Sequence, residues 1–255
     1  MLDNKVCQTI SKVAAVTLMF WAVKILATTL GETGGDALSM TMKLGYAVSS
    51  LIFLVFFGIA LVVQVRAREY HPFRYWTVVV ASTTVGTTLS DYLDRTLGLG
   101  YVNSSILLFS GVLAILFVWY RVVGRIEFER ITTKIEEAFY WLTIAVSNTL
   151  GTALGDFVAT TTGLGFERGA LVFAGMLAMV AAAHFGLKTI PAAFLFWAAY
   201  VLTRPLGATL GDVVTKSHAE GGLGMDRIIS SVVILATMIV MVVLMTKKKN
   251  IARRG

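Results

Sequence analysis

The sequence predicts an all-α membrane protein of eight helices, arranged as four repeated pairs. Three observations support this class: 56% of the 255 residues are hydrophobic, only 15% are charged, and apolar stretches of membrane-spanning length recur along the chain. A soluble domain normally carries about 25% charged residues. The single cysteine excludes a disulfide framework, and three prolines exclude a proline-rich linker.

Eight stretches approach the length of about 20 mostly apolar residues that a membrane-spanning helix requires. Four of them are strongly apolar: Leu44–Val65, Tyr101–Tyr120, Ala170–Leu187 and Ile228–Met245. Four others alternate with these and contain more Thr, Ser and Gly: Val13–Leu30, Trp76–Leu89, Tyr140–Leu154 and Ile190–Leu210. We expect a single transmembrane domain with repeats at 10–66, 67–124, 134–187 and 188–246.

The distribution of basic residues predicts the orientation in the membrane. Of the 22 Lys and Arg residues, 15 lie in the N-terminal segment, in every second connection and in the C-terminal tail. Basic connections remain in the cytoplasm, so both termini are expected to be cytoplasmic. The net charge of +7 is therefore explained by topology, and no nucleic-acid partner is expected.

Each repeat carries the same residues at the same spacing. An aromatic–Trp pair is followed, ten residues after the Trp, by a glycine, then by a second small residue and an aspartate. The glycines and small residues are Gly31, Gly35, Gly86, Ser90, Gly151, Gly155, Gly207 and Gly211. The aspartates, each 15 residues after its Trp, are Asp36, Asp91, Asp156 and Asp212.

A unit of one polar and one apolar helix crosses the membrane twice, so every copy enters from the same side. The repeats are then parallel and related by a pseudo-symmetry axis normal to the membrane. We expect the polar helices inside and the apolar helices outside, because this keeps polar groups away from lipid.

The Trp-x9-Gly-x3-small-Asp pattern resembles that of a bacterial family of integral membrane proteins with four tandem two-helix repeats of unknown function, each marked by one tryptophan. The resemblance covers roughly residues 10–246. It implies a multi-pass protein of the bacterial inner membrane, and it implies no activity.

The paired small residues predict close helix packing, because small residues four apart let helix backbones approach each other in a membrane. The same glycines would also permit a broken helix whose backbone groups bind ions. The two uses remain open at this point.

The aspartates and their neighbours predict a cation site. Intramembrane carboxylates are costly and usually mark ion or proton pathways. Positions 8, 11 and 15 after each Trp share one helix face, and their oxygens suit hard metal cations. The candidate cation-binding residues are Thr29, Glu32, Asp36, Thr84, Thr87, Asp91, Thr149, Thr152, Asp156 and Asp212, with the five acids as candidate metal ligands. The alternative is that each Asp is a helix-end residue in solvent.

Two basic residues, Lys24 and Arg204, fall inside predicted spans. A buried cation in a membrane needs a partner. We expect these residues to act as counter-ions or gates for the acids, or to form structural ion pairs with an Asp.

These features favour a small secondary transporter of an inorganic cation, divalent or trivalent, driven by proton or ion exchange, with export favoured over import. Its expected partners are that cation, protons and membrane lipid, with no cofactor and no enzymatic activity. One alternative is a non-transporting membrane scaffold or sensor. Another is an intramembrane aspartyl hydrolase, suggested by the Leu-Gly-Asp sequences at Asp156 and Asp212.

Overall fold

The protein is helical in all regular elements of the part that the computed structural model describes, residues 12–67, 69–129, 131–187 and 189–254. This part contains eight long α-helices and no strand. They are α2 (Leu18–Asp36), α3 (Gly45–Arg66), α4 (Pro72–Asp91), α5 (Gly100–Val123), α6 (Lys134–Asp156), α7 (Gly165–Gly186), α8 (Ala192–Thr215) and α9 (Arg227–Arg254).

Six of these helices are long and apolar enough to cross a membrane: α3, α5, α6, α7, α8 and α9. They support a multi-pass membrane protein. By length and composition α2 and α4 do not qualify within the described residues. In α2 the charged residues Lys24, Glu32 and Asp36 lower the hydropathy, and α4 is rich in Thr.

The start of α2 differs from the prediction of a span beginning at Val13. Residues 13–17 are not helical, and the helix begins at Leu18. Thr17 is extended (φ −139°), and its hydroxyl accepts a hydrogen bond from the Phe20 backbone N–H at 3.1 Å. A threonine in this geometry caps a helix, which explains the later start.

The helices α2, α4 and α6 each end in a five-residue π-helical turn that leads into the next helix. These turns are η1 (Ala37–Thr41), η2 (Tyr92–Thr96) and η3 (Phe157–Thr161). The following helices begin at the glycine of the Leu-Gly-aromatic sequences, Gly45, Gly100 and Gly165, which have φ between 72° and 77°. A positive φ favours glycine, which explains why the tripeptide recurs. The fourth unit has instead a short 3₁₀ turn, η4 (His218–Glu220).

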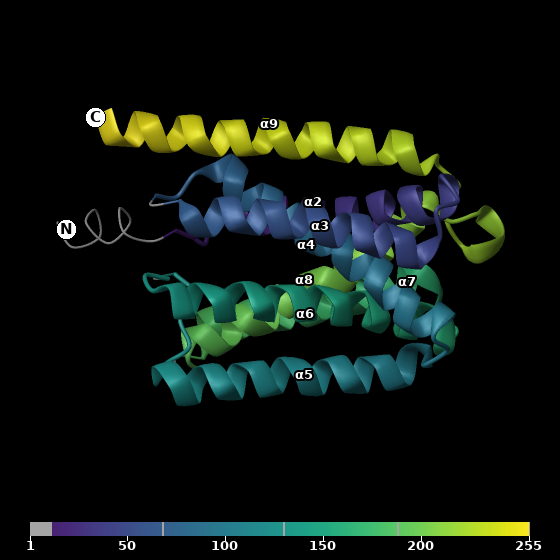
Figure 1. The fold of residues 1–255 in the computed structure, drawn as a ribbon, viewed down its shortest axis with the longest axis horizontal. Coiled ribbons are helices and arrows are strands. Elements are labelled where there is room, and N and C mark those ends of the chain that lie inside the picture. The colour runs from purple at the N-terminus through teal and green to yellow at the C-terminus, as the bar shows by residue number, and fades with distance from the viewer. Residues whose placement is uncertain (1–11, 68, 130, 188, 255) are drawn as a thin grey trace.

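Four helices, which we call the ring helices, contact one another in a closed cycle: α2 with α4, α4 with α6, α6 with α8, and α8 with α2. Each of the other four, the flanking helices, packs on the first helix of the following unit: α3 on α4, α5 on α6, α7 on α8 and α9 on α2. The last helix thus returns to the first unit. Figure 1 shows α9 and α5 on opposite sides of the molecule, with ring helices between them.

Aromatic contacts repeat around this cycle near the N-terminal ends of the ring helices. The aromatic residue that precedes each Trp packs against the Trp of the following unit. The four pairs, with ring centroids 5.5–5.7 Å apart, are Phe20–Trp76, Tyr75–Trp141, Tyr140–Trp197 and Phe196–Trp21. The tryptophans therefore join neighbouring units.

The glycines ten residues after each Trp lie at the contacts between ring helices. A Cβ at any of them would collide with the neighbouring helix. The contacts are Gly31 with Thr83, Gly86 with Asn148, Gly151 with Arg204, and Gly207 with Thr28. The second small residues continue them: Gly35 with Thr87, Gly155 with Ala208, and Gly211 with Glu32, whereas the Ser90 hydroxyl donates to Asp94. Close approach of the backbones is the physical use of these residues.

Candidate functional site

The four repeat aspartates, which we call the carboxylate layer, lie at or near the C-terminal ends of the ring helices. Asp36, Asp91 and Asp156 are the last residues of their helices, and Asp212 lies three residues before the end of α8. All four are at most 3% exposed. They are therefore buried, and the alternative of ordinary solvent-exposed helix ends does not describe them.

Lys216 bridges two members of the carboxylate layer. Its Nζ lies 3.3 Å from Asp36 Oδ2 and 3.3 Å from Asp212 Oδ1, so it joins α8 to α2. The Nε of Arg227 also lies 3.5 Å from Asp36 Oδ2. Burial lowers the pKa of the Lys216 ammonium, but the nearby carboxylates of Asp212 and Asp36 outweigh burial and hold that pKa above its ordinary value.

Arg95 makes the equivalent bridge between the other two units. Its Nε lies 2.9 Å from Asp91 Oδ1 and its Nη2 lies 3.5 Å from Asp156 Oδ2, so it joins α4 to α6. It also donates to the Tyr46 hydroxyl at 3.2 Å. The carboxylate layer is thus divided into two pairs of acids, each holding a basic side chain.

The spacing of the charged residues in the sequence is a signal for these two bridges. Arg95 and Lys216 are each four residues after the Asp of their own unit, whereas the other two units have Met40 and Thr160 there. Residues four positions apart lie on one helix face, so this spacing brings the opposite charges together at the helix end. It distinguishes the second and fourth units, which carry a basic residue there, from the first and third units.

Arg204 forms the centre of a second cluster deeper in the ring, which we call the Arg204 cluster. The side chain is fully buried, and its Nη1 and Nη2 each lie 3.1 Å from Glu32 Oε2. Nη2 also donates to Thr87 Oγ1 at 2.5 Å and to Thr152 Oγ1 at 2.6 Å. These residues come from all four ring helices. The expectation of an ion pair between Arg204 and an Asp is corrected: within the described residues its acidic partner is Glu32.

Lys24 lies one turn of α2 before the carbonyl of Thr28 to which Arg204 donates. Lys24 is fully buried, its Nζ is 3.5 Å from Asn148 Oδ1, and it lies 4.2 Å from the centroid of the Tyr200 ring. The expectation of a pair between Lys24 and an Asp is also corrected, because Lys24 forms no ion pair among the residues that the structure describes.

The predicted stripe of oxygen ligands is only partly assembled. The residues 11 positions after Trp, Glu32, Thr87 and Thr152, converge on Arg204. The hydroxyls 8 positions after Trp bond to carbonyls of their own helices: Thr29 to Ile25, Thr84 to Val80 and Ala81, and Thr149 to Ala145. A threonine in a helix commonly satisfies its hydroxyl in this way.

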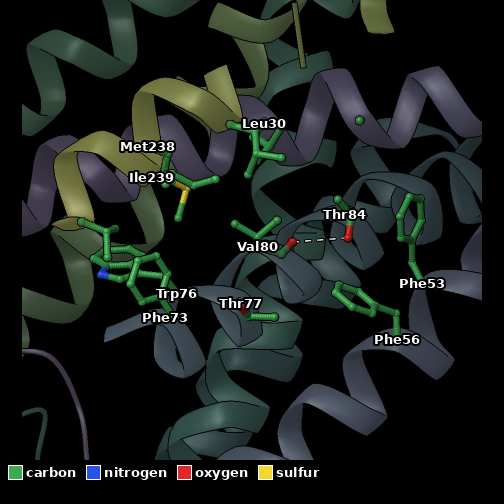
Figure 2. Close-up of a pocket in the computed structure, with 13 residues that line it drawn as sticks. Leu30, Phe53, Phe56, Phe73, Trp76, Thr77, Val80, Thr84, Met238 and Ile239 are labelled. Carbon is green, nitrogen blue, oxygen red and sulfur yellow. Dashed lines mark hydrogen bonds between the residues drawn. The ribbon is translucent and has the colours of Figure 1, made fainter. Parts of the chain in front are cut away.

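Thr84 lies at the wall of an apolar groove of about 440 Å³ between α2, α3, α4 and α9. Figure 2 shows its hydroxyl bonded to the carbonyl of Val80, with Phe53, Phe56 and Leu30 around the groove. Thr84 therefore lines an apolar groove and does not share a site with the acids with which the sequence pattern grouped it.

Within the described residues, no group of three or more His, Cys, Asp or Glu side chains has an arrangement that could hold a metal ion. The assignment of Glu32, Asp36, Asp91, Asp156 and Asp212 as metal ligands stays a prediction. In this conformation, basic side chains lie against the acids.

A family model described as Repeat of Unknown Function (DUF347) matches the chain four times, at residues 19–70, 74–124, 139–189 and 195–250. The prediction of four repeats is confirmed. No curated protein and no solved structure matches the chain significantly.

Proposed function

The chain belongs to the family that carries the Repeat of Unknown Function (DUF347), and we propose that it is a small secondary transporter. It moves an inorganic cation across a membrane in exchange for protons or another ion. The observation that carries this proposal is the burial of four repeat aspartates, each against a basic side chain that is tethered to the protein.

We infer that all eight long helices cross the membrane, with the ring helices inside and the flanking helices outside around an axis normal to the membrane. The closed cycle of contacts supports this arrangement. The modest hydropathy of α2 and α4 is consistent with it, because a helix surrounded by protein does not need an apolar surface. The excess of Lys and Arg supports cytoplasmic termini, and the membrane is proposed to be the bacterial inner membrane.

The mechanism is a competition for carboxylates. The Lys216 ammonium and the Arg95 guanidinium each lie where a substrate cation would meet two carboxylates. A cation that enters from solvent must displace them. Their return then drives the cation off, because two positive charges at one pair of acids repel each other.

The Arg204 cluster closes the path beyond this layer. Arg204 is bonded to Glu32, Thr87 and Thr152 on the three other ring helices. A guanidinium in this place repels a cation and fills the centre of the ring. Passage therefore requires the Arg204–Glu32 pair to separate, which distinguishes a carrier from an open channel.

The carboxylate oxygens of these acids are ligands that hard cations prefer, so they favour a divalent or trivalent cation. The aspartyl hydrolase fits less well. Its two carboxylates must share a proton, whereas a guanidinium or ammonium between carboxylates favours both ionised forms.

The proposal is tested with proteoliposomes that contain a metal-sensitive dye and a pH-sensitive dye. Mg²⁺, Ca²⁺, Mn²⁺ and a trivalent cation are supplied in turn. We expect wild-type protein to move at least one of them with a counter-flow of protons, and Asp36→Asn, Asp91→Asn and Asp156→Asn to lower the rate about tenfold or more.

The matched control is Glu167→Gln, which removes an exposed carboxylate at the start of α7. It should transport at the wild-type rate. Full activity in all three Asp variants, or no cation movement by the wild type, would reject the carboxylate mechanism; the latter would favour the scaffold or sensor.

A further inference from the structure

Lys24 is a buried amine that the carboxylate mechanism leaves unused. It is fully buried in α2, and its one hydrogen bond among the described residues, to Asn148 Oδ1, is 3.5 Å long. The amine also lies over the face of the Tyr200 ring, 4.2 Å from its centroid, where it makes a cation–π contact and no hydrogen bond. An ammonium has three donors, so this environment satisfies it poorly.

The orientation of Asn148 is set from its other side. Its Nδ2 donates to Ser82 Oγ at 2.9 Å, and Ser82 Oγ donates to the Val79 carbonyl at 2.7 Å. The amide oxygen therefore faces Lys24. It provides a single neutral acceptor, which is a weak partner for a full charge in a dry interior.

The balance of buried charges in the ring also disfavours a charged Lys24 amine. Between the tryptophans and the carboxylate layer, the buried charged side chains of the ring helices are two basic residues, Lys24 and Arg204, and one acid, Glu32. Glu32 is already engaged by both terminal nitrogens of Arg204. Arg keeps its proton in proteins, so a neutral interior requires Lys24 to be the group that gives its proton up.

Within the described residues, the other helices around Lys24 place no acid in an ion pair with it. The positions equivalent to Arg204 are Thr83 in α4 and Asn148 in α6, and α8 provides Arg204 and Tyr200. In α9 no titratable residue lies between Arg227 and Lys247.

Two further titratable groups, Tyr75 of α4 and Tyr140 of α6, lie nearer the tryptophan end of the ring. Their hydroxyls bond to each other at 2.7 Å. These neighbours are neutral at physiological pH, because an ordinary tyrosine has a pKa of about 10.

We propose that Lys24 is a proton-binding site: its amine is neutral in this closed conformation and takes up one proton when the ring opens to water. The amine gains a proton from water on one side of the membrane and returns it to water on the other. Its use in transport rests on the proposed function: a proton on Lys24 and a cation on the carboxylate layer add charge to the same buried interior, so they bind in alternation.

The state of the amine is read by NMR on detergent-solubilised full-length protein containing lysine labelled with ¹³C at Cε. Lys24→Met identifies the Lys24 signal by its loss. At about pH 8 an ordinary lysine, with a pKa of about 10.4, is charged. We expect the Lys24 Cε signal at the neutral-amine position at that pH, moving toward the ammonium position on acidification. A signal at the ammonium position from about pH 6 to pH 9 would overturn the proposal.

Asn148→Asp is the second variant, because it places a carboxylate of nearly the same shape beside the amine. We expect it to move the Lys24 signal to the ammonium position at about pH 8. The matched control is Lys216, already paired with Asp36 and Asp212, whose signal should stay at the ammonium position in both proteins. An unchanged Lys24 signal in Asn148→Asp would also count against the proposal.

Transport is measured separately on the same proteins. Asn148→Asp should abolish proton counter-flow in the proteoliposome assay. If the NMR titration is as expected while wild-type protein moves no cation, the proton site stands and the proposed transport function fails. If transport occurs while Lys24 remains charged throughout, the proton site fails and the transport function stands.

Discussion

The Arg204–Glu32 pair is expected to be the strongest single side-chain interaction in the ring. Both terminal nitrogens lie 3.1 Å from the same carboxylate oxygen, and neither residue is exposed beyond 3%. At an effective dielectric constant of about 20, two unit charges at that distance attract by about 5 kcal/mol. The loss of hydration of both ions offsets much of this. We expect a net coupling of about 2–3 kcal/mol between the two side chains.

The perturbation is a double-mutant cycle. Glu32→Gln leaves a buried guanidinium without a carboxylate and should lower the free energy of unfolding by about 3–5 kcal/mol. Arg204→Met should cost less, about 1–3 kcal/mol, because Glu32 can then take up a proton and remain neutral. The double variant should be less destabilised than the sum of the two.

The assay is reversible unfolding of the purified protein in mixed detergent micelles, followed by far-UV circular dichroism. Hydrogen bonds between membrane helices average only about 0.6 kcal/mol, so the expected coupling can be told from ordinary hydrogen bonding. Single-variant effects that add to within about 0.5 kcal/mol would refute the reasoning. Such additivity would mean that the two charges do not depend on each other.

Two further predictions concern packing and pH. Gly207→Ala should destabilise the protein by about 1–3 kcal/mol in thermal unfolding, because the new Cβ collides with Thr28. The control is Gly58→Ala, whose new Cβ meets nothing within 4 Å, so this variant should be neutral or slightly stabilising. Equal effects of the two substitutions would contradict the packing role of Gly207. The Ser217 hydroxyl and backbone N–H hold the pKa of Glu220 below its ordinary value. A lowered folded-state pKa contributes stability that is present above the ordinary value of about 4.3 and is lost as the pH falls through the lowered value. The protection of the amides in loop residues 217–222, measured against the intrinsic exchange rate at each pH, should therefore fall below about pH 4. Glu220→Gln should remove this pH dependence, and an unchanged profile in that variant would argue against the cap.

The repeat pattern made much of the fold predictable. The spacing from Trp76 to Gly86 and Asp91 recurs in four units, and each glycine lies where two ring helices touch. A glycine at a helix contact is readable from sequence because the need for a small residue is local to one position. The helix start at Leu18 was not readable in this way, because the apolar run continues through Val13 while Thr17 caps the helix.

The partners of the charged residues were harder to predict. Arg204 was expected either to serve the acids as a counter-ion or gate or to pair with an Asp, and its acidic partner is Glu32, 172 positions earlier in the chain. Which acid lies opposite a basic residue depends on the rotation and height of two separate helices. Neither quantity follows from a repeat that is the same in every unit.

By itself the sequence determined the class of the molecule, its four units and the acids that each unit carries, because hydropathy and spacing act along a single chain segment. Only the tertiary structure decided that Lys216 and Arg95 divide the aspartates into two pairs, that Arg204 takes Glu32, and that Lys24 has no acid within the described chain. Electrostatic interactions act through space, and the cyclic packing of helices sets those distances.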